Sequence, residues 1–461
     1  MKKPFMMQAI RQGVIAFLSV YLTFFPAWLT AKPIHSTRVA SGQLPVLKST
    51  QTHPDGWRYE RGEGTYHQVV KQSKERVIIQ WDSFDVGSRA TMEFRQNGKS
   101  ALNRIYDNTP SQIYGNLKAD GKIYLINQNG ILFGPNGNAT NLNKLVASSM
   151  NIKDEDFLGN TIVNNFNREK YYTPENGTPV YMLKTVNGDL EMVSEEEFDS
   201  FEGGDVINQG SITTQQQGSV CLLGSNVKNE GKISSDNGQV LMAGGSAFKN
   251  EIRISQSDDG FTKTEEIITD HDGDVTNSGD IYADAGEVGL YGKIVKHDGL
   301  IRSLSTIRSG SSIRLVASDS IITGKSSEID AGVKAEIDEN GDEVEVLTSS
   351  PFDGRELKLE SPGADEPILI AHYGDITANS GIVDLDAGTG GRIYLGPDSK
   401  IDVSGSWEQK TAQDKVISNQ LNSLELRDEV RFKELNGDYL GEEIHYLTHE
   451  GSAIGNISEH L

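Results

Sequence analysis

Short alternations of apolar and polar residues recur along the middle of the chain at intervals of about twenty residues. The pattern Val-x-Asn-x-Gly-x-Ile occurs at 206–212, 227–233 and 275–281, and looser copies follow at 295–301 and 376–403. Alternation places Val and Ile on one face of each strand, and one unit alone cannot bury that face. Stacked units can bury it, so the spacing predicts a parallel β-solenoid. An antiparallel sandwich, the alternative, would not require turns at a fixed phase.

Asparagine and glycine hold fixed places in these units. Asn208, Asn229 and Asn277 each stand two residues before a glycine. Both residue types tolerate a positive φ, so we expect them where the chain turns from one strand to the next. Asparagines at the same place in successive coils are also expected to stack into a hydrogen-bonded ladder.

Three insertions interrupt the repeat, and each has alternating flanks around an Asn-Gly or Asp-Gly turn, as in a β-hairpin. The predicted hairpins are Val180–Val193, Ile252–Ile268 and Val333–Leu347. We expect them to project from the solenoid. After the first hairpin, Ser194 begins a segment with capping-box spacing, which predicts a short helix through Phe201.

The first 31 residues have the organisation of a secretory signal peptide. Residues 1–12 are basic, residues 13–29 are almost wholly apolar, and Ala31 offers a small residue for cleavage. A membrane anchor is the alternative, but Pro26 lies in an apolar run that is short for the ~20 residues of a spanning helix. The pattern favours cleavage and export.

Composition and charge narrow the class of protein further. The 461 residues include 48 glycines and 13 prolines, and aromatic residues make up only 7%, which favours a turn-rich β protein. The net charge is −23, and removing the basic leader leaves −26, which excludes nucleic acid as a partner. The single cysteine, Cys221, lies in an apolar run and is expected to be buried as a small hydrophobic residue.

The segment before the repeat is richer in aromatic residues and is expected to cap the end of the solenoid, since an open end would template aggregation. Residues 77–94 are predicted to form strand structure, and residues 121–134 are predicted to form two strands on either side of an Asn-Gly turn. Within this segment the combination of four short runs is specific. They are Ile79–Phe84 with Trp81 and Phe84, Asn103-Arg104, Pro110–Gly115 with Ser111, and Leu125–Gly134.

These runs resemble the secretion domain of two-partner-secretion exoproteins of the filamentous haemagglutinin type, over about residues 55–250. The resemblance implies an all-β fold, a right-handed parallel β-helix with an N-terminal cap and extrahelical β-hairpins. It also implies delivery to the periplasm of a Gram-negative cell by the general secretion machinery. The periplasmic domains of a cognate outer-membrane β-barrel transporter would then recognise the domain, and the chain would reach the cell surface or the medium.

The family's Asn-Pro-Asn-Gly-Ile motif corresponds here to Asn127, Gln128, Asn129, Gly130 and Ile131. Gln128 stands where the family has proline, so the turn is expected to be less rigid than in the family. Two roles stay open for the motif. It either contacts the transporter or forms a turn that stabilises the cap.

The predicted organisation has four parts. Residues 1–31 are the signal peptide, 32–250 the secretion domain, and 251–405 the continuing β-helix. Residues 406–461 are either a tail or the truncated start of a further region, since family members run on for many more repeats. Leu461 would then end a truncated exoprotein or one piece of a split one.

The sequence contains few candidates for a catalytic, phosphate-binding or metal-binding site. Gly98-Lys99-Ser100 and Gly324-Lys325-Ser326 lack the upstream glycine of a phosphate loop. His445 and His449 fall in a predicted strand and do not favour a metal pair. The acidic run 270–274 could hold calcium but more often marks an acidic turn. The sequence therefore predicts no cofactor and no resident metal.

Three functions remain, in order of support. The first is an exported exoprotein whose rod binds a host or bacterial surface ligand in adhesion or haemagglutination. The second is the stalk of a contact-dependent inhibition toxin, which would need a catalytic domain that 411–461 is too short to supply. The third is a β-helix polysaccharide-degrading enzyme, which needs converging carboxylates; acids such as Asp280 and Asp284 form no cluster in the sequence.

Overall fold

The computed structural model describes most of the chain between residues 39 and 404, together with several strands outside this core. The continuous described stretches are 39–49, 56–152, 154–159, 203–245, 272–304, 311–332, 355–379 and 381–404. Two compact units form, one from residues 1–335 and 348–404 and the other from 336–347 and 405–461. The predicted signal peptide and the predicted helix at 194–201 lie outside the described residues.

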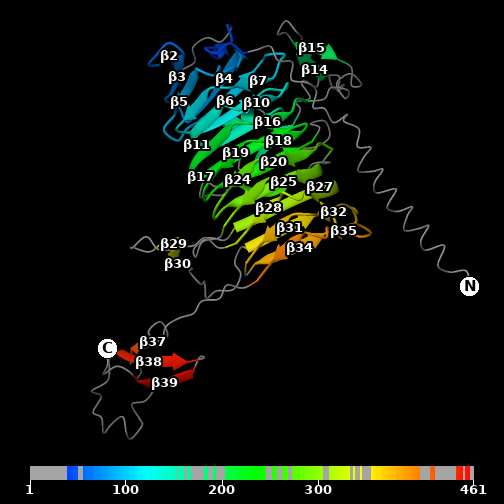
Figure 1. Cartoon of the computed structure of the whole chain (residues 1–461). Coiled ribbons are helices and arrows are strands. Elements are labelled where there is room, and N and C mark those ends of the chain that lie inside the picture. Colours follow the sequence, from blue (N-terminus) through cyan, green and yellow to red (C-terminus); the bar gives the residue numbers. More distant parts are fainter. Residues whose placement is uncertain are drawn as a thin grey trace, which may run out of the picture. The chain divides into compact units, whose positions relative to one another are not determined.

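The first unit is a right-handed parallel β-helix with three faces, each a column of parallel strands (Figure 1). The first face contains β4 (Arg76–Ser83), β6 (Ser100–Ile105), β9 (Lys122–Ile126), the second half of β11 (Asn138–Ser148), the second half of β17 (Ser211–Gly224), β20 (Gln239–Gly244), the first half of β25 (Glu287–His297), the first half of β27 (Ser311–Thr323), β31 (Arg355–Glu360) and β34 (Ile382–Asp386).

The other two faces complete each coil. The second face contains β7 (Ser111–Ile113), β10 (Ile131–Phe133), β16 (Val206–Asn208), β18 (Val227–Asn229), β23 (Val275–Asn277), the second halves of β25 and β27, β32 (Leu369–His372) and β35 (Arg392–Leu395). The third contains β3 (His67–Gln72), β5 (Thr91–Arg95), β8 (Asn116–Ala119), the first halves of β11 and β17, β19 (Lys232–Ser234), β24 (Asp280–Tyr282), β26 (Leu300–Arg302), β28 (Glu328–Asp330), β33 (Asp375–Thr377) and β36 (Lys400–Asp402).

The register of the coils confirms the repeat found in the sequence. Val206 pairs with Val227, and Val227 pairs with Val275 across an insertion. The inward residues of this column are at most 1% exposed, as are Ile212 and Ile233 on the third face. Alternation along each strand therefore fills one continuous apolar core, because each coil covers the inward face of the coil before it.

The predicted asparagine ladder is present, but the glycines beside it have a different role from the one expected. The side-chain amides of Asn208, Asn229 and Asn277 are joined by hydrogen bonds of 2.8 and 2.7 Å. Their glycines do not have positive φ. A Cβ on Gly231 would lie 2.1 Å from the carbonyl oxygen of Gly210 in the preceding coil, so close stacking of the backbone demands glycine here.

A cap of antiparallel strands closes the N-terminal end, but the residues predicted to form it do not. Residues 77–94 and 121–134 instead contribute parallel strands to the first coils, because their alternating apolar residues face the core. β1 (Val46–Leu47) pairs antiparallel with β4, and β2 (Trp57–Arg61) pairs antiparallel with β3. The pairing occupies the strand edges that the first coil would otherwise present to solvent, which opposes edge-to-edge aggregation.

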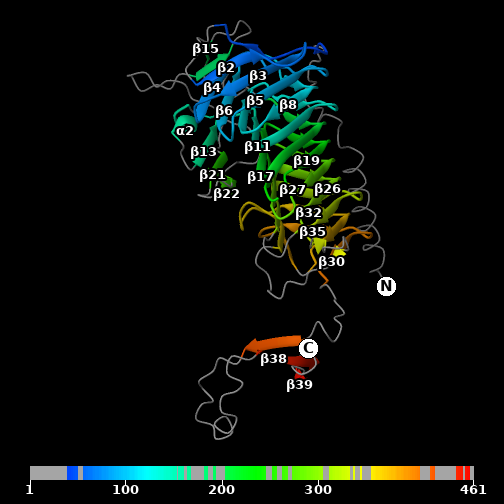
Figure 2. The ribbon, with the colours of Figure 1, turned by 90° about the vertical axis from the view of Figure 1, so that its left-hand side faces the viewer.

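An outer layer covers the outward side of the first face over its early coils (Figure 2). It contains β12 (Asn151–Ile152), β13 (Val163–Asn167), β21 (Ile252–Gln256), β22 (Thr262–Ile267) and the short helix α2 (Asp154–Leu158). Phe157 packs on outward residues of the coils, including Leu102 and Tyr124, in a second apolar cluster. Cys221 lies buried in the same cluster, as predicted, and burial raises the pKa of its thiol.

The predicted insertions do pair as antiparallel hairpins, but the second does not project alone. β14 (Tyr181–Lys184) pairs with β15 (Leu190–Val193), and β29 (Glu336–Ile337) pairs with β30 (Glu343–Val344). The hairpin β21–β22 instead adds to β13 in a four-stranded sheet, because β13 supplies an edge for β21. The helix α2 was not predicted.

The second unit contains the hairpin β29–β30 and a three-stranded antiparallel sheet. Its strands are β37 (Val416–Gln420), β38 (Glu443–His449) and β39 (Ser452–Asn456). His445 and His449 lie on β38, so the strand predicted for them is confirmed.

At one corner of the β-helix, successive coils place a residue other than glycine in the left-handed backbone conformation, and this supports a stability prediction. Gln217, Asn237 and Ala285 occupy equivalent places and have positive φ, 57° at Ala285. A residue with a Cβ pays about 1 kcal/mol of conformational free energy to adopt a positive φ. We expect Ala285→Gly to raise the free energy of unfolding by about 0.5–1 kcal/mol, measured by urea titration. Ala283→Gly is the control, since Ala283 is absent from the residues with positive φ and should lose stability instead.

Candidate functional site

The motif Asn127 to Ile131 forms the turn that leads from β9 on the first face to β10 on the second. The Asn127 side chain is fully buried. Its amide nitrogen donates to the Thr109 carbonyl and to Ser111 Oγ, each at 3.0 Å, and its amide oxygen accepts from the Asn129 backbone at 2.9 Å. One side chain therefore joins the turn to the segment that precedes β7.

The rest of the motif is fixed by backbone contacts. Asn129 donates through its side chain to the Asp107 carbonyl at 2.8 Å. Gly130 has φ +103°, and a Cβ there would lie 2.5 Å from the Asp205 carbonyl oxygen, so both conformation and space require glycine. Gln128, where the family has proline, is half-buried and accepts a 2.8 Å bond from the Gly204 backbone through its carbonyl oxygen. The contacts of the neighbouring coil thus hold a turn that lacks proline.

Trp81, Phe84 and Asn103 meet in the core beneath the cap. The Trp81 ring makes edge-to-face contacts with Tyr59 and Phe84, at centroid separations of 5.6 and 5.2 Å. Its indole nitrogen donates to Asn103 Oδ1 at 3.0 Å, and Asn103 donates in turn to the carbonyls of Ala101 and Tyr124. These family-motif residues therefore tie the cap to the first two coils of the first face.

Arg104 has a separate task, on the outward side of the same strand. Its Nε donates to Asn151 Oδ1 at 3.2 Å, its Nη2 donates to the Ile152 carbonyl, and it forms an ion pair with Asp154. Because Arg104 is only 9% exposed, these bonds occur largely away from water. Arg104 therefore attaches the outer layer to the coils.

Pro110 precedes the strand β7, which Ser111 begins, and the segment is held by partners that the sequence does not predict. Asp85 accepts a 2.8 Å bond from the Gln112 backbone, and burial raises the pKa of Asp85 to about 6. Asp107 and Thr109 accept through their backbone carbonyls, and every residue type has such a carbonyl. The sequence carries no signal for these acceptors, so only the folded turn identifies them.

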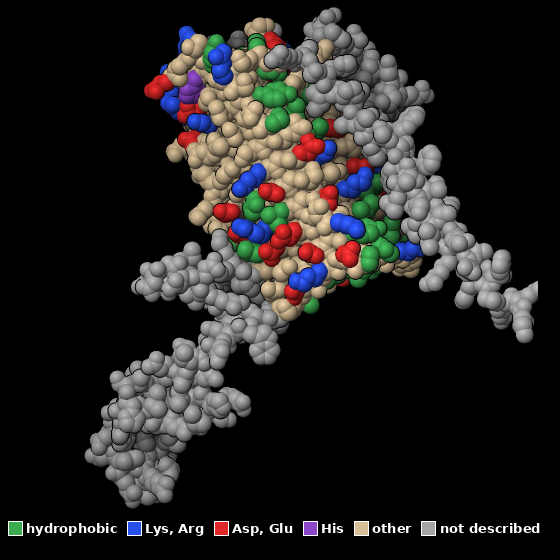
Figure 3. Space-filling view, viewed as in Figure 1, with side chains coloured by type: hydrophobic (Ala, Val, Ile, Leu, Met, Phe, Trp, Pro, Cys, Tyr) green, Lys and Arg blue, Asp and Glu red, His purple; other side chains and the backbone are tan. Residues whose placement is uncertain are grey.

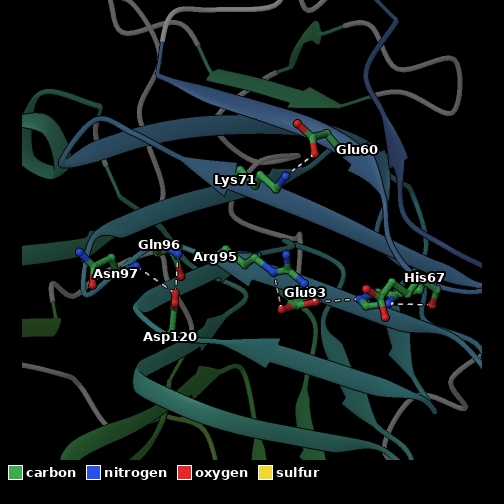
Figure 4. Close-up of polar contacts among 9 residues, drawn as sticks. Glu60, His67, Lys71, Glu93, Arg95, Gln96, Asn97 and Asp120 are labelled. Atoms are coloured by element: carbon green, nitrogen blue, oxygen red, sulfur yellow. Dashed lines mark hydrogen bonds and ion pairs between the residues drawn. The ribbon is translucent and has the colours of Figure 1, made fainter.

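A network of charged side chains lies on the third face beside the cap (Figure 4). Glu60 pairs with Lys71 at 2.6 Å, while Glu93 accepts from Arg95 at 2.7 Å and contacts His67 at 2.8 Å. The Arg95 bond is the main cause of a lowered Glu93 pKa. The pair Glu60–Lys71 joins β2 to β3, and the contact of His67 with Glu93 joins β3 to β5. These charged side chains have partners on neighbouring strands, so we assign them to stabilisation of the sheet.

The described surface offers little for metal or acid–base chemistry. Figure 3 shows both signs of charge interspersed on one face. Within the described residues, no group of three His, Cys, Asp or Glu could hold a metal ion. Asp270 lies outside those residues, whereas Asp272 and Asp274 are inside them. Asp284, one of the acids considered for a catalytic site, is buried and accepts hydrogen bonds from Arg302 Nε and Nη2 at 3.2 and 3.0 Å.

Of the helices that the structure describes, none combines the length and the apolar character needed to cross a bilayer.

The chain is similar to two curated proteins from Haemophilus influenzae, both described as heme/hemopexin-binding protein. One is 30% identical over 156 residues, covering 33% of this chain and 16% of that protein. The other is 34% identical over 87 residues, covering 18% of this chain and 9% of that protein. The matched region is therefore a small part of each relative.

Two solved structures are also similar to the chain. The secretion domain of HMW1 from Haemophilus influenzae is 19% identical with a TM-score of 0.48, covering 76% of this chain and 98% of that one. The filamentous hemagglutinin secretion domain is 14% identical with a TM-score of 0.31, covering 78% and 100%.

A family model covers the cap, the motif turn and the coils together. The model of the TPS secretion domain, the domain of two-partner secretion, matches residues 48–303, which is more than half of the chain. The chain belongs to the family of two-partner secretion domains, as the sequence motifs indicated.

Proposed function

We propose that the chain is an exported exoprotein whose secretion domain, within residues 32–250, is recognised by a cognate outer-membrane transporter. The observation that carries this proposal is the family match over residues 48–303, which includes the cap and the motif turn. The basic and apolar leader at 1–31 supports delivery to the periplasm by the general secretion machinery. The chain then passes through the transporter to the cell surface or the medium.

The motif turn acts, in this proposal, as a clasp, by which we mean that the side chains of Asn127 and Asn129 hold the turn to residues 107–111 in the folded domain. Asn127 is fully buried and its bonds are directed to neighbouring segments of the same chain. A side chain in that position has no surface to offer a transporter once the domain has folded. Recognition through Asn127 would therefore have to precede folding, whereas a clasp works only after it.

The β-helix serves, on this proposal, to present a surface for adhesion to a host or bacterial ligand, and it has no catalytic role. A parallel β-helix is a stiff rod that can hold many side chains in register. Asp284, one of the acids that a polysaccharide-degrading site could use, is buried and bound to Arg302. The heme/hemopexin binding named for the relatives belongs to proteins of which this chain spans at most 16%.

The export route is tested by expressing the full chain with and without its cognate transporter in a Gram-negative host. We expect the mature chain in the medium or on the surface when the transporter is present, and in the periplasm when it is absent. Cell fractionation with immunodetection measures both. Equal amounts outside the cell in the two strains would contradict two-partner export, whereas retention of the signal peptide would contradict delivery to the periplasm.

A further inference from the structure

The asparagine ladder ends on a histidine, and its hydrogen bonds all run in one direction. The amide nitrogen of each asparagine donates toward the next coil, from Asn208 to Asn229 and from Asn229 to Asn277. The Asn277 amide nitrogen then lies 3.1 Å from His297 Nδ1. Because the amide oxygen of Asn277 already accepts from Asn229, its nitrogen must point to the imidazole. His297 Nδ1 is therefore an acceptor and carries no proton.

The second ring nitrogen of His297 confirms this assignment. Nε2 lies 3.2 Å from the Glu328 carbonyl oxygen, which can only accept, so Nε2 carries the proton. The asparagines place their nitrogens toward equivalent carbonyls, as Asn277 does toward that of Leu300 at 3.4 Å. His297 thus occupies an asparagine place in the coil, with a neutral ring whose tautomer is set by both neighbours.

We propose that His297 is an acid-sensitive latch of the β-helix: protonation of Nδ1 sets it against the Asn277 amide, reverses the terminal bond of the ladder and loosens the coils that contain β18, β23 and β25. A protonated Nδ1 would face an NH₂ group, so two donors would meet. Rotating the Asn277 amide would relieve that contact only by opposing Asn229 in turn. The conflict therefore passes along the ladder.

Burial opposes a positive charge on His297, whereas hydrogen bonds to the backbone of Glu328 and Asn277 favour one. The residue is 1% exposed, and its neighbours in the column, Asn277 and Thr323, are uncharged. The charged or titratable groups near it are the Asp298 carboxylate, which favours protonation, and His372 two coils further on, which opposes it. Burial dominates and lowers the pKa of His297 to about 4.

His372 occupies the same column and provides an internal comparison. Its Nδ1 lies 2.6 Å from Thr323 Oγ1, and its Nε2 lies 3.4 Å from the Lys400 carbonyl. A hydroxyl can rotate and accept a hydrogen bond as readily as it donates one. Protonation of His372 therefore meets a partner that can adapt, with Asp375 nearby to favour the charge, although burial still lowers the pKa of His372.

The sign of the effect follows from proton binding. The unfolded chain takes up a proton on this histidine below about pH 6.5, whereas the folded chain does so only below about 4. Between these values the unfolded state binds more protons, so stability falls as the pH falls through that window. Half of the folded chains already carry the proton at pH 4, so the ratio of unfolded to folded chain should rise about 100-fold between pH 7 and pH 4 from this residue.

The test compares the full chain with His297→Asn and His372→Asn in urea titrations at pH 7, 6, 5 and 4, followed by far-UV circular dichroism. Asparagine at 297 extends the existing ladder, so this variant should fold and lose the acid effect of about 100-fold between pH 7 and pH 4. His372→Asn should keep most of it. Acids such as Asp85 titrate in all three proteins and cancel in the comparison. Equal pH dependence in the wild type and His297→Asn would overturn the latch, as would equal losses in the two variants.

A second measurement keeps the latch testable if His297→Asn does not fold. In the wild-type chain with ¹⁵N-labelled histidine, His297 should show the Nε2–H tautomer at pH 7 and titrate below pH 5. A Nδ1–H tautomer, or titration near 6.5, would contradict the latch. Neither experiment involves a transporter, so its outcome is independent of the proposed export route.

Discussion

Replacing Trp81 by alanine is expected to lower the free energy of unfolding by about 5 kcal/mol. Removing a fully buried tryptophan typically costs about 3–5 kcal/mol, because packing is lost and a cavity remains. Here the substitution also leaves Asn103 Oδ1, which accepts from the indole nitrogen at 3.0 Å, without its donor in the core. An unsatisfied buried acceptor adds about 1–3 kcal/mol. Urea titration followed by far-UV circular dichroism measures the loss.

Two further variants separate the contributions at Trp81. Trp81→Phe keeps a ring beside Tyr59 and Phe84 but removes the hydrogen bond, so it should cost about 2 kcal/mol. Tyr394→Ala is the control, because Tyr394 is 47% exposed and should cost less than about 1 kcal/mol. A loss at Trp81→Ala no greater than that of the control would contradict a cap that is coupled to the coils.

The coil repeat could be predicted because its physical cause is local. Val206, Val227 and Val275 fill equivalent core places, and the spacing between them records the length of a coil. The ladder was visible for the same reason, since Asn208 and Asn229 repeat the same residue type. Its continuation to His297 was not visible, because histidine satisfies the same two hydrogen-bonding directions with a different side chain.

The outer layer could not be predicted because it depends on contacts between distant segments. β13 pairs with β21 across residues 168–251, which include two coils of the β-helix, and each segment alone looks like an isolated strand or hairpin. Arg104 was identified through its motif, but its partners Asn151 and Asp154 lie in a stretch with no repeat. A repeat reports on neighbours along the coil axis and carries no information about what covers the outside.

The glycines of the repeat show a further limit of the sequence. Gly210 and Gly231 suggested turns with positive φ, whereas their actual constraint is the carbonyl of the adjacent coil. Both causes select glycine, so residue type alone cannot separate them. Gly130 meets both conditions at once, so a side chain there would be opposed by the backbone conformation and by the Asp205 carbonyl.

Asn127→Ala is expected to lower the free energy of unfolding by about 4 kcal/mol. The substitution leaves the Thr109 carbonyl, Ser111 Oγ and the Asn129 backbone nitrogen without the partner they have at 2.9–3.0 Å. Each buried polar group left unsatisfied costs about 1–3 kcal/mol, and part of the total is recovered where water reaches the turn. Urea titration at pH 7 gives the value, and a loss below about 1 kcal/mol would contradict the clasp.

Export of Asn127→Ala separates the two roles left open for the motif. Asn229→Ala is the matched control. Asn229, like Asn127, has a fully buried and hydrogen-bonded side-chain amide, but it lies in the asparagine ladder and outside the motif. If the turn is a clasp, transporter-dependent secretion of the two variants should fall by similar factors at similar stability. If Asn127→Ala alone abolishes secretion while both proteins keep comparable stability, the side chain is read by the transporter before folding. In that case Asn127 would serve twice, first in contact with the transporter while the chain is unfolded and then as a buried hydrogen-bonding residue of the folded domain.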